Sequence, residues 1–155
     1  MNTVENNGTD AAPILQVEDD DNDVVLLRYA FSSAGLDRPV QAVSDGQQAI
    51  EYLAGEGKFA NRQEYPLPCM VLLDIKLPRR GGLEVLQWIR SQPALKAVVV
   101  IMFSASSYPE EINRAYELGA NSFLTKPAGA EELTRLVSVI HTYWFQHNQF
   151  SDPVW

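Results

Sequence analysis

The feature that most constrains the fold is a fivefold alternation of short apolar segments with segments of helical periodicity. One apolar segment, residues 70–73, shows no polar alternation, which is typical of a strand buried on both faces. Residues 98–103 form the longest apolar run and are expected to be a central strand. The expected strands are residues 14–17, 40–43, 70–73, 98–103 and 122–124.

The segments between these strands carry apolar residues at spacings of three and four. Val24, Leu27 and Phe31, for example, fall on one helical face, and Gly35 is a suitable helix stop. Strict alternation of strands and helices with short connections predicts an α/β fold, in which a parallel sheet has helices on both faces.

Two helix starts have the pattern of a capping box, in which Ser is followed three residues later by Gln or Glu. Ser44 with Gln47 is expected to begin the second helix, and Ser107 with Glu110 the fourth. The fourth helix is expected to stop at Gly119.

The chain is expected to form one domain over residues 13–147, with a disordered tail at 1–12 and a C-terminal tail at 148–155. One connection, residues 55–68, is longer than the roughly 2–6 residues usual for such loops and is interpreted as a surface excursion.

Composition narrows the classes of protein. Hydrophobic residues make up 46% of the chain, which is enough for a core, and the net charge of -8 argues against a broad nucleic-acid surface. Cys69 is the single cysteine, so no internal disulfide can form. The sequence has no signal-peptide pattern and no apolar run near the ~18 residues of a membrane span, so a soluble cytoplasmic protein is expected.

Polar residues follow four of the expected strands. Functional residues in parallel sheets gather outside the carboxyl ends of the strands. At those ends lie Glu18 and Asp19, Asp74, Ser104, and Lys126. The sequence therefore predicts three carboxylates, a hydroxyl and an ammonium at one edge of the sheet.

Carboxylates so close together repel, and a cation among them would relieve the repulsion. A set of oxygen ligands suits Mg²⁺, which keeps several waters and leaves positions for phosphate oxygens. A carboxylate of this set would be a competent nucleophile toward a phosphoryl group, with Lys126 neutralising charge and Ser104 donating a hydrogen bond.

These segments, in this order and spacing, resemble the receiver domain of two-component response regulators, the CheY-like class. The resemblance covers roughly residues 13–147 and implies a flavodoxin-like (βα)5 fold with strand order 2-1-3-4-5. The matching motifs are Val17-Glu18-Asp19-Asp20, Leu72-Leu73-Asp74-Ile75-Lys76-Leu77-Pro78 with Gly81-Gly82, Phe103-Ser104-Ala105, and Lys126-Pro127.

The resemblance implies a role for each residue of the acidic cluster. Asp74 would accept a phosphoryl group from a histidine kinase or a phosphotransfer protein. Asp19 would bind Mg²⁺ directly, Glu18 through water, and Lys76 through its backbone carbonyl. Glu18 stands where Asp is commoner, and Lys76 places a cation beside the site.

The resemblance also implies a switch. Ser104 would sense the phosphoryl group, Phe123 would move inward on activation, and Lys126 would pair with the phosphate. The bond from Lys126 to Pro127 is usually cis in this family. Phe123 replaces the commoner Tyr and lacks its hydroxyl.

A narrower resemblance is to stand-alone regulators of bacterial phytochromes. It rests on the 55–68 excursion, the acidic stretch 18–23 and the aromatic segment 143–145. Regulators of this type often form homodimers through the last strand and helix, and Tyr143 and Trp144 could equally be core packing.

Several residues have plainer interpretations. Asp20, Asp21 and Asp23 are interpreted as a solvated helix start. A calcium loop is excluded, since position 6 counted from Asp19 is Val24 where Gly is needed. His141 and His147 are interpreted as surface or packing residues, and Arg79 and Arg80 as a solvated loop with kinase contact as the alternative.

Two functions other than that of a response regulator are alternatives on this fold. A phosphohydrolase with an aspartyl-phosphate intermediate would need a second Asp where Lys76 stands. A flavin or nucleotide carrier would need a donor-rich loop where Glu18 and Asp19 stand.

Overall fold

A computed structural model of the chain describes residues 12–151, and within them a five-stranded parallel sheet has the order β2-β1-β3-β4-β5. The predicted α/β fold and strand order are confirmed. The strands are β1 (Ile14–Val17), β2 (Val40–Val43), β3 (Met70–Leu73), β4 (Val99–Ser104) and β5 (Ser122–Thr125). Residues 1–11 and 152–155 of the expected tails lie outside the described residues.

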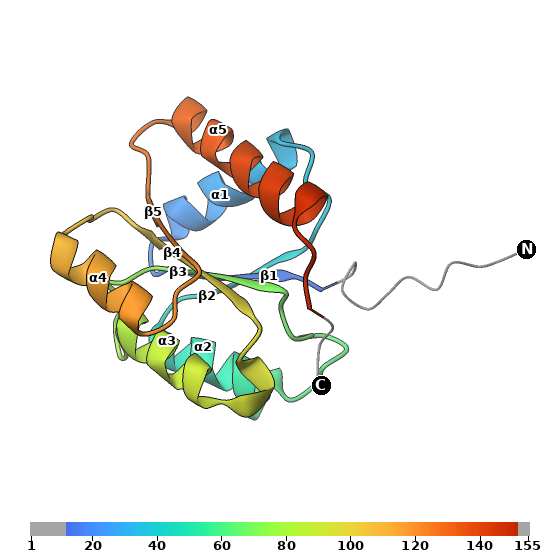
Figure 1. Cartoon of the computed structure of the whole chain (residues 1–155). Helices are drawn as coiled ribbons and strands as arrows, with labels where there is room; N and C mark the ends of the chain where they lie inside the picture. Colours follow the sequence, from blue (N-terminus) through green and yellow to red (C-terminus); the bar gives the residue numbers. More distant parts are fainter. Residues whose placement is uncertain (1–11, 152–155) are drawn as a thin grey trace, which may run out of the picture.

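Five α-helices of the described chain cover the two faces of the sheet, with α1 and α5 on one face and α2, α3 and α4 on the other (Figure 1). Their bounds are α1 (Asp21–Ser33), α2 (Gly46–Ala54), α3 (Gly82–Ser91), α4 (Pro109–Glu117) and α5 (Ala130–Ile140). No helix within residues 12–151 is long and apolar enough to cross a membrane.

The central strands β1, β3 and β4 are buried at every position, as their unbroken apolar runs predict. Alternate side chains point to opposite faces, so that Leu15 joins the core under α2 and α3 while Ile14 joins the core under α1 and α5. Gln16 is the polar exception in β1 and is only 3% exposed.

Both predicted capping boxes were wrong, because each helix has its N-cap one residue later than predicted. The N-cap of α2 is Asp45, whose Oδ1 accepts a hydrogen bond of 2.8 Å from the backbone N–H of Gln48. The N-cap of α4 is Tyr108, and Pro109 takes the first helical position, where its missing N–H is not needed. In both places another residue of the polar stretch has the extended backbone that a cap requires.

The 55–68 excursion is packed onto α2. The rings of Phe59 and Tyr65 contact the ring of Tyr52 and each other, with centroids 5.1 to 5.9 Å apart. Arg62 ties the segment down, because its guanidinium donates to the carbonyls of Tyr52 at 2.7 Å, Leu53 at 2.9 Å and Tyr65 at 3.2 Å. Burial raises the pKa of Tyr52 to about 12.

After α5 the chain continues as a π-helical segment, His141–His147. Trp144 and Phe145 pack against the core beneath α1 and α5, and Phe150 contacts both rings. Tyr143 is 55% exposed, and its ring contacts that of Trp144 with centroids 5.0 Å apart. Core packing and a surface role were the two alternatives for this aromatic segment. Trp144 belongs to the packing, and Tyr143 is on the surface.

Replacing Arg62 by Ala should destabilise the domain by about 2–3 kcal/mol, since three carbonyls lose a charged donor. Arg135→Ala is the control, because that exposed side chain makes only an i,i+4 pair with Glu131 and should cost less than about 0.5 kcal/mol. Urea unfolding followed by circular dichroism measures both. Equal losses in the two variants would show that Arg62 does not hold the excursion in place.

Candidate phosphoacceptor site

The register of the sheet brings four strand ends together. Val17 pairs with Leu73, Leu73 with Met102, and Ser104 with Thr125. The residues that follow, or end, these strands are Glu18, Asp74, Ser104 and Lys126, as the sequence predicted. Parallel strands place them at one edge because all their carboxyl ends point the same way.

The loop after Asp74 is shaped by Gly82. A Cβ at Gly82 would lie 1.9 Å from the backbone oxygen of Asp74, so any side chain there would push the loop away. The N–H of Gly82 donates to the carbonyl of Ile75 at 2.8 Å and closes the loop. Gly82 therefore lets α3 begin directly against the end of β3.

Lys126 is the centre of the site. Its ammonium Nζ lies 2.8 Å from Asp74 Oδ2, forms a second ion pair with Glu18 Oε2, and lies 3.4 Å from Asp23 Oδ2. The Lys126 side chain is 13% exposed, that of Glu18 3% and that of Asp74 10%. These are partly buried ion pairs, which solvent screens much less than surface ones.

Burial and charge act against each other on these groups. Burial raises the pKa of Glu18, and the hydrogen bond from Lys126 opposes this only in part. Burial alone would lower the pKa of Lys126, but hydrogen bonds to Asp74 and Glu18 outweigh it and raise the pKa. The ammonium is thus held in its charged form. Because more than one carboxylate surrounds it, the site keeps an excess of negative charge.

Three carboxylates of the described residues can share one cation. Glu18, Asp19 and Asp74 each offer an oxygen, and the three oxygens lie within 4.8 Å of one another. Ligand oxygens around one octahedral Mg²⁺ are about 3–4 Å apart, so small movements would suffice. The all-oxygen donor set fits a hard divalent ion, which when bound would supply neutralising charge to a phosphoryl group.

Ser104 is 1% exposed and ends β4. Its hydroxyl lies 3.3 Å from the hydroxyl of Ser106, which in turn donates to Glu111 of α4 at 2.9 Å. Sequence reasoning missed Ser106 and Glu111, because nothing local indicates that α4 would present a carboxylate to this loop.

The remaining predicted residues lie around this cluster. Lys76 is exposed, and its backbone N–H donates to Asp74 Oδ1 at 3.4 Å. Phe123 is half-buried in β5 and packs against the core under α2 and α3. The expectation of a cis bond before Pro127 was wrong, because residues 12–151 contain no cis peptide bond.

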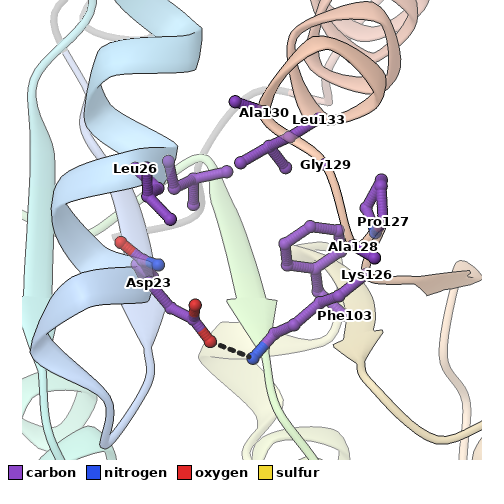
Figure 2. A pocket seen from close by; sticks show the side chains of 11 residues that line it. Asp23, Leu26, Phe103, Lys126, Pro127, Ala128, Gly129, Ala130 and Leu133 are labelled. Atoms are coloured by element: carbon purple, nitrogen blue, oxygen red, sulfur yellow. Dashed lines mark hydrogen bonds and ion pairs between the residues drawn. The ribbon is translucent and has the colours of Figure 1, made fainter.

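Asp23 lies at the helix start, as the sequence predicted, but its side chain also has a partner that was not predicted. It is half-buried in the first turn of α1, and its carboxylate points across to Lys126 (Figure 2). Asp20 does have the expected role, since its side chain caps α1 by accepting from the N–H of Asn22 and Asp23. Arg79, expected in a solvated loop, pairs with the buried Asp45 at 3.3 Å.

The architecture and this site define a class of signalling domain. Residues 14–138 match the family model described as response regulator receiver domain. The chain therefore belongs to the response regulator receiver family, as the resemblance predicted.

Within that family, the chain is similar to single-domain regulators of phytochromes. It is 32% identical over 133 residues to response regulator Rcp1 of Synechocystis, covering 86% of this chain and 88% of Rcp1. The crystal structure of the phosphorylated cyanobacterial phytochrome response regulator RcpA superposes with a TM-score of 0.84 at 34% identity, covering 90% of this chain and 98% of RcpA. A probable methanogenesis regulatory protein, FilR2 of Methanothrix harundinacea, is 36% identical over 143 residues, covering 90% of this chain and 88% of FilR2.

Receiver domains bind Mg²⁺ or Mn²⁺ at an acidic pocket. The Mn²⁺-bound form of Rcp1 superposes on this chain with a TM-score of 0.81 at 29% identity, covering 90% of this chain and 99% of that chain. This chain has an acidic cluster, formed by Glu18, Asp19 and Asp74, at the carboxyl edge of its sheet.

Adding Mg²⁺ should stabilise the chain, because a cation relieves the repulsion among these carboxylates. At a concentration 100 times the dissociation constant the gain would be about 2.7 kcal/mol, measured as a rise in melting temperature. Asp19→Asn should lose most of this gain, whereas Asp21→Asn, an exposed neighbour outside the cluster, should retain it. If both variants retained the stabilisation by Mg²⁺ equally, Asp19 would not be a ligand of the cation.

Proposed function

We propose that this chain is a stand-alone response regulator that accepts a phosphoryl group on Asp74 in a Mg²⁺-dependent reaction. The observation that supports this most is the arrangement around Asp74, which is 8% exposed, paired with Lys126 at 2.8 Å, and part of a three-carboxylate cluster. A partly buried carboxylate beside a fixed cation is suited to attack phosphorus and to hold the product.

In the proposed reaction a carboxylate oxygen of Asp74 attacks the phosphorus of a phosphohistidine. A P–O bond forms, the P–N bond breaks, and the imidazole nitrogen keeps the electron pair. Lys126 pairs with the transferred oxygens, and the Ser104 hydroxyl turns from Ser106 to donate to one of them. Both groups therefore neutralise charge where it appears.

Phosphorylation would be transmitted by a shift between two existing conformations. When Ser104 turns away, Ser106 loses one of its contacts while keeping Glu111 of α4. Phe123 lies in β5, two residues before Thr125, the partner of Ser104 in the sheet. It would then move inward, and the face formed by α4, β5 and α5 would change. Lys76 contributes its backbone carbonyl to the cation in this scheme.

The phosphoryl donor is proposed to be a cytoplasmic sensor histidine kinase of the phytochrome type, or a phosphotransfer protein. Similarity to RcpA and Rcp1 supports the phytochrome pathway. The net charge of -8 supports a protein partner and not a nucleic acid.

The two competing functions have no support from a specific contact. A phosphohydrolase would need a general acid two residues after Asp74, where the exposed Lys76 stands. A nucleotide or flavin carrier would have to place phosphates against Glu18 and Asp19, which would repel them.

We also propose that the chain forms a homodimer through the end of α5. Val139 and Tyr143 are 63% and 55% exposed and line one shallow groove with Ser138, Thr142 and His147. Apolar side chains grouped in this way are typical of protein interfaces.

Labelling with radioactive acetyl phosphate should place one phosphoryl group per chain on the wild type and none on Asp74→Asn. Asp21→Asn is the control, because it removes a carboxylate of the same neighbourhood that lies outside the cluster. Chelating Mg²⁺ should abolish labelling. Label that persists in Asp74→Asn would falsify the assignment of the acceptor.

Val139→Glu should convert a dimer of twice 17.3 kDa to a monomer in light scattering, because a charge would be buried in the interface. Val25→Glu on α1 is the matched control, with the same change at a position 65% exposed. A wild type that is monomeric both with and without a phosphoryl mimic would overturn the dimer.

A further inference from the structure

Lys126 has one partner that the acidic cluster does not include. Glu18 and Asp74, its closest partners, are also two of the three residues that can share a cation. Asp23, at 3.4 Å, belongs to α1 and lies outside that set. The ammonium therefore has two kinds of carboxylate partner, one shared with a metal ion and one of its own.

A divalent cation and the ammonium would share two carboxylates, those of Glu18 and Asp74. A cation bound to Glu18 and Asp74 would withdraw their negative charge from Lys126 and would repel the ammonium directly. Pairing with another acceptor is then favoured, because an unpaired ammonium that is only 13% exposed is poorly solvated. Among the acceptors that already contact Lys126, only Asp23 is left free by such a cation.

A pocket between α1 and α5 provides space for this movement. It has a volume of about 90 Å³, against roughly 10–15 Å³ for one water, and Lys126 and Asp23 both line it. Figure 2 shows the two side chains pointing toward each other from opposite sides, with Phe103 on the same side as Lys126.

A buried polar group lines the same pocket. Gln16, in the middle of β1, is 3% exposed, and its Oε1 has no hydrogen-bond partner within the described chain. Buried amide oxygens are nearly always paired, so this oxygen is able to accept a hydrogen bond from a donor that enters the pocket. An ammonium drawn from Glu18 and Asp74 into the pocket would be such a donor.

We propose that Asp23 and Gln16 form a second binding position for the ammonium of Lys126, occupied when a divalent cation binds Glu18, Asp19 and Asp74. Asp23 is then a positioning residue that keeps the lysine charged and close to the acceptor until a phosphoryl group arrives. This last step rests on the proposed phosphorylation of Asp74, whereas the movement driven by the cation does not.

The test is a double-mutant cycle on Mg²⁺ affinity, measured by calorimetry on the unphosphorylated full chain. Asp23→Asn should weaken Mg²⁺ binding about 3- to 5-fold, because the displaced lysine loses its alternative partner. In a Lys126→Met background the same change should have an effect of less than about 2-fold, since no ammonium then needs a second position. Equal losses with and without Lys126 would overturn the proposal, because they would reflect a general charge effect or local misfolding.

Asp21→Asn is the matched charge control. It removes one carboxylate from the same turn of α1, and Asp21 makes no ion pair within residues 12–151. An effect as large as that of Asp23→Asn would also overturn the proposal.

A second measurement follows the side chains directly by NMR. On adding Mg²⁺, the amide side-chain resonances of Gln16 should shift in the wild type and stay nearly unchanged in Lys126→Met. Shifts of equal size in both proteins would show that the ammonium does not reach Gln16. Failure of Asp74 labelling would leave these results intact and would refute only the phosphorylation, so the two hypotheses fail separately.

Discussion

The site depends on one partly buried ammonium that is outnumbered by carboxylates. Lys126 contacts Glu18, Asp74 and Asp23, and Asp19 lies in the same cluster. Burial is the main cause that raises the pKa of Glu18, and the neighbouring carboxylate of Asp74 adds to it, so the site has an affinity for further positive charge. The excess of negative charge suits a divalent ion in the unphosphorylated protein. Once such an ion neutralises the carboxylates, the lysine would be available to pair with an anionic group.

The fold maintains this imbalance by placing the charges on rigid elements. Glu18 and Asp74 directly follow two central buried strands, and Lys126 directly follows β5, whose residue Thr125 is in register with Ser104. Gly82 lets α3 start against the Asp74 carbonyl without displacing it. The backbone positions of these carboxylates are therefore fixed close together by the strands.

The sequence predicted the sheet and the five residues at its edge because both depend on local patterns. A strand buried on both faces is an unbroken apolar run, and the polar residue after it marks the functional edge. The helix caps failed because several adjacent polar residues could each accept the helical N–H groups, and only the backbone conformation selects Asp45 over Ser44. Asp23, Ser106 and Arg62 were missed or left without a role because their partners come from distant elements, and their spacing along the chain does not indicate the contact.

The position of Lys126 also explains how a charge at the site could reach the surface. Lys126 directly follows β5, which also contains Phe123, so the lysine and the aromatic side chain belong to the same short segment of chain. The backbone N–H of Lys126 donates to the carbonyl of Ser104 at 2.7 Å, and Ser104 connects through Ser106 to Glu111 of α4. The ammonium is thus coupled to β5 by the chain itself and to α4 by hydrogen bonds. In the proposed switch, a change in which carboxylate holds the lysine would therefore act on β5 and α4, two of the three elements of the α4–β5–α5 face.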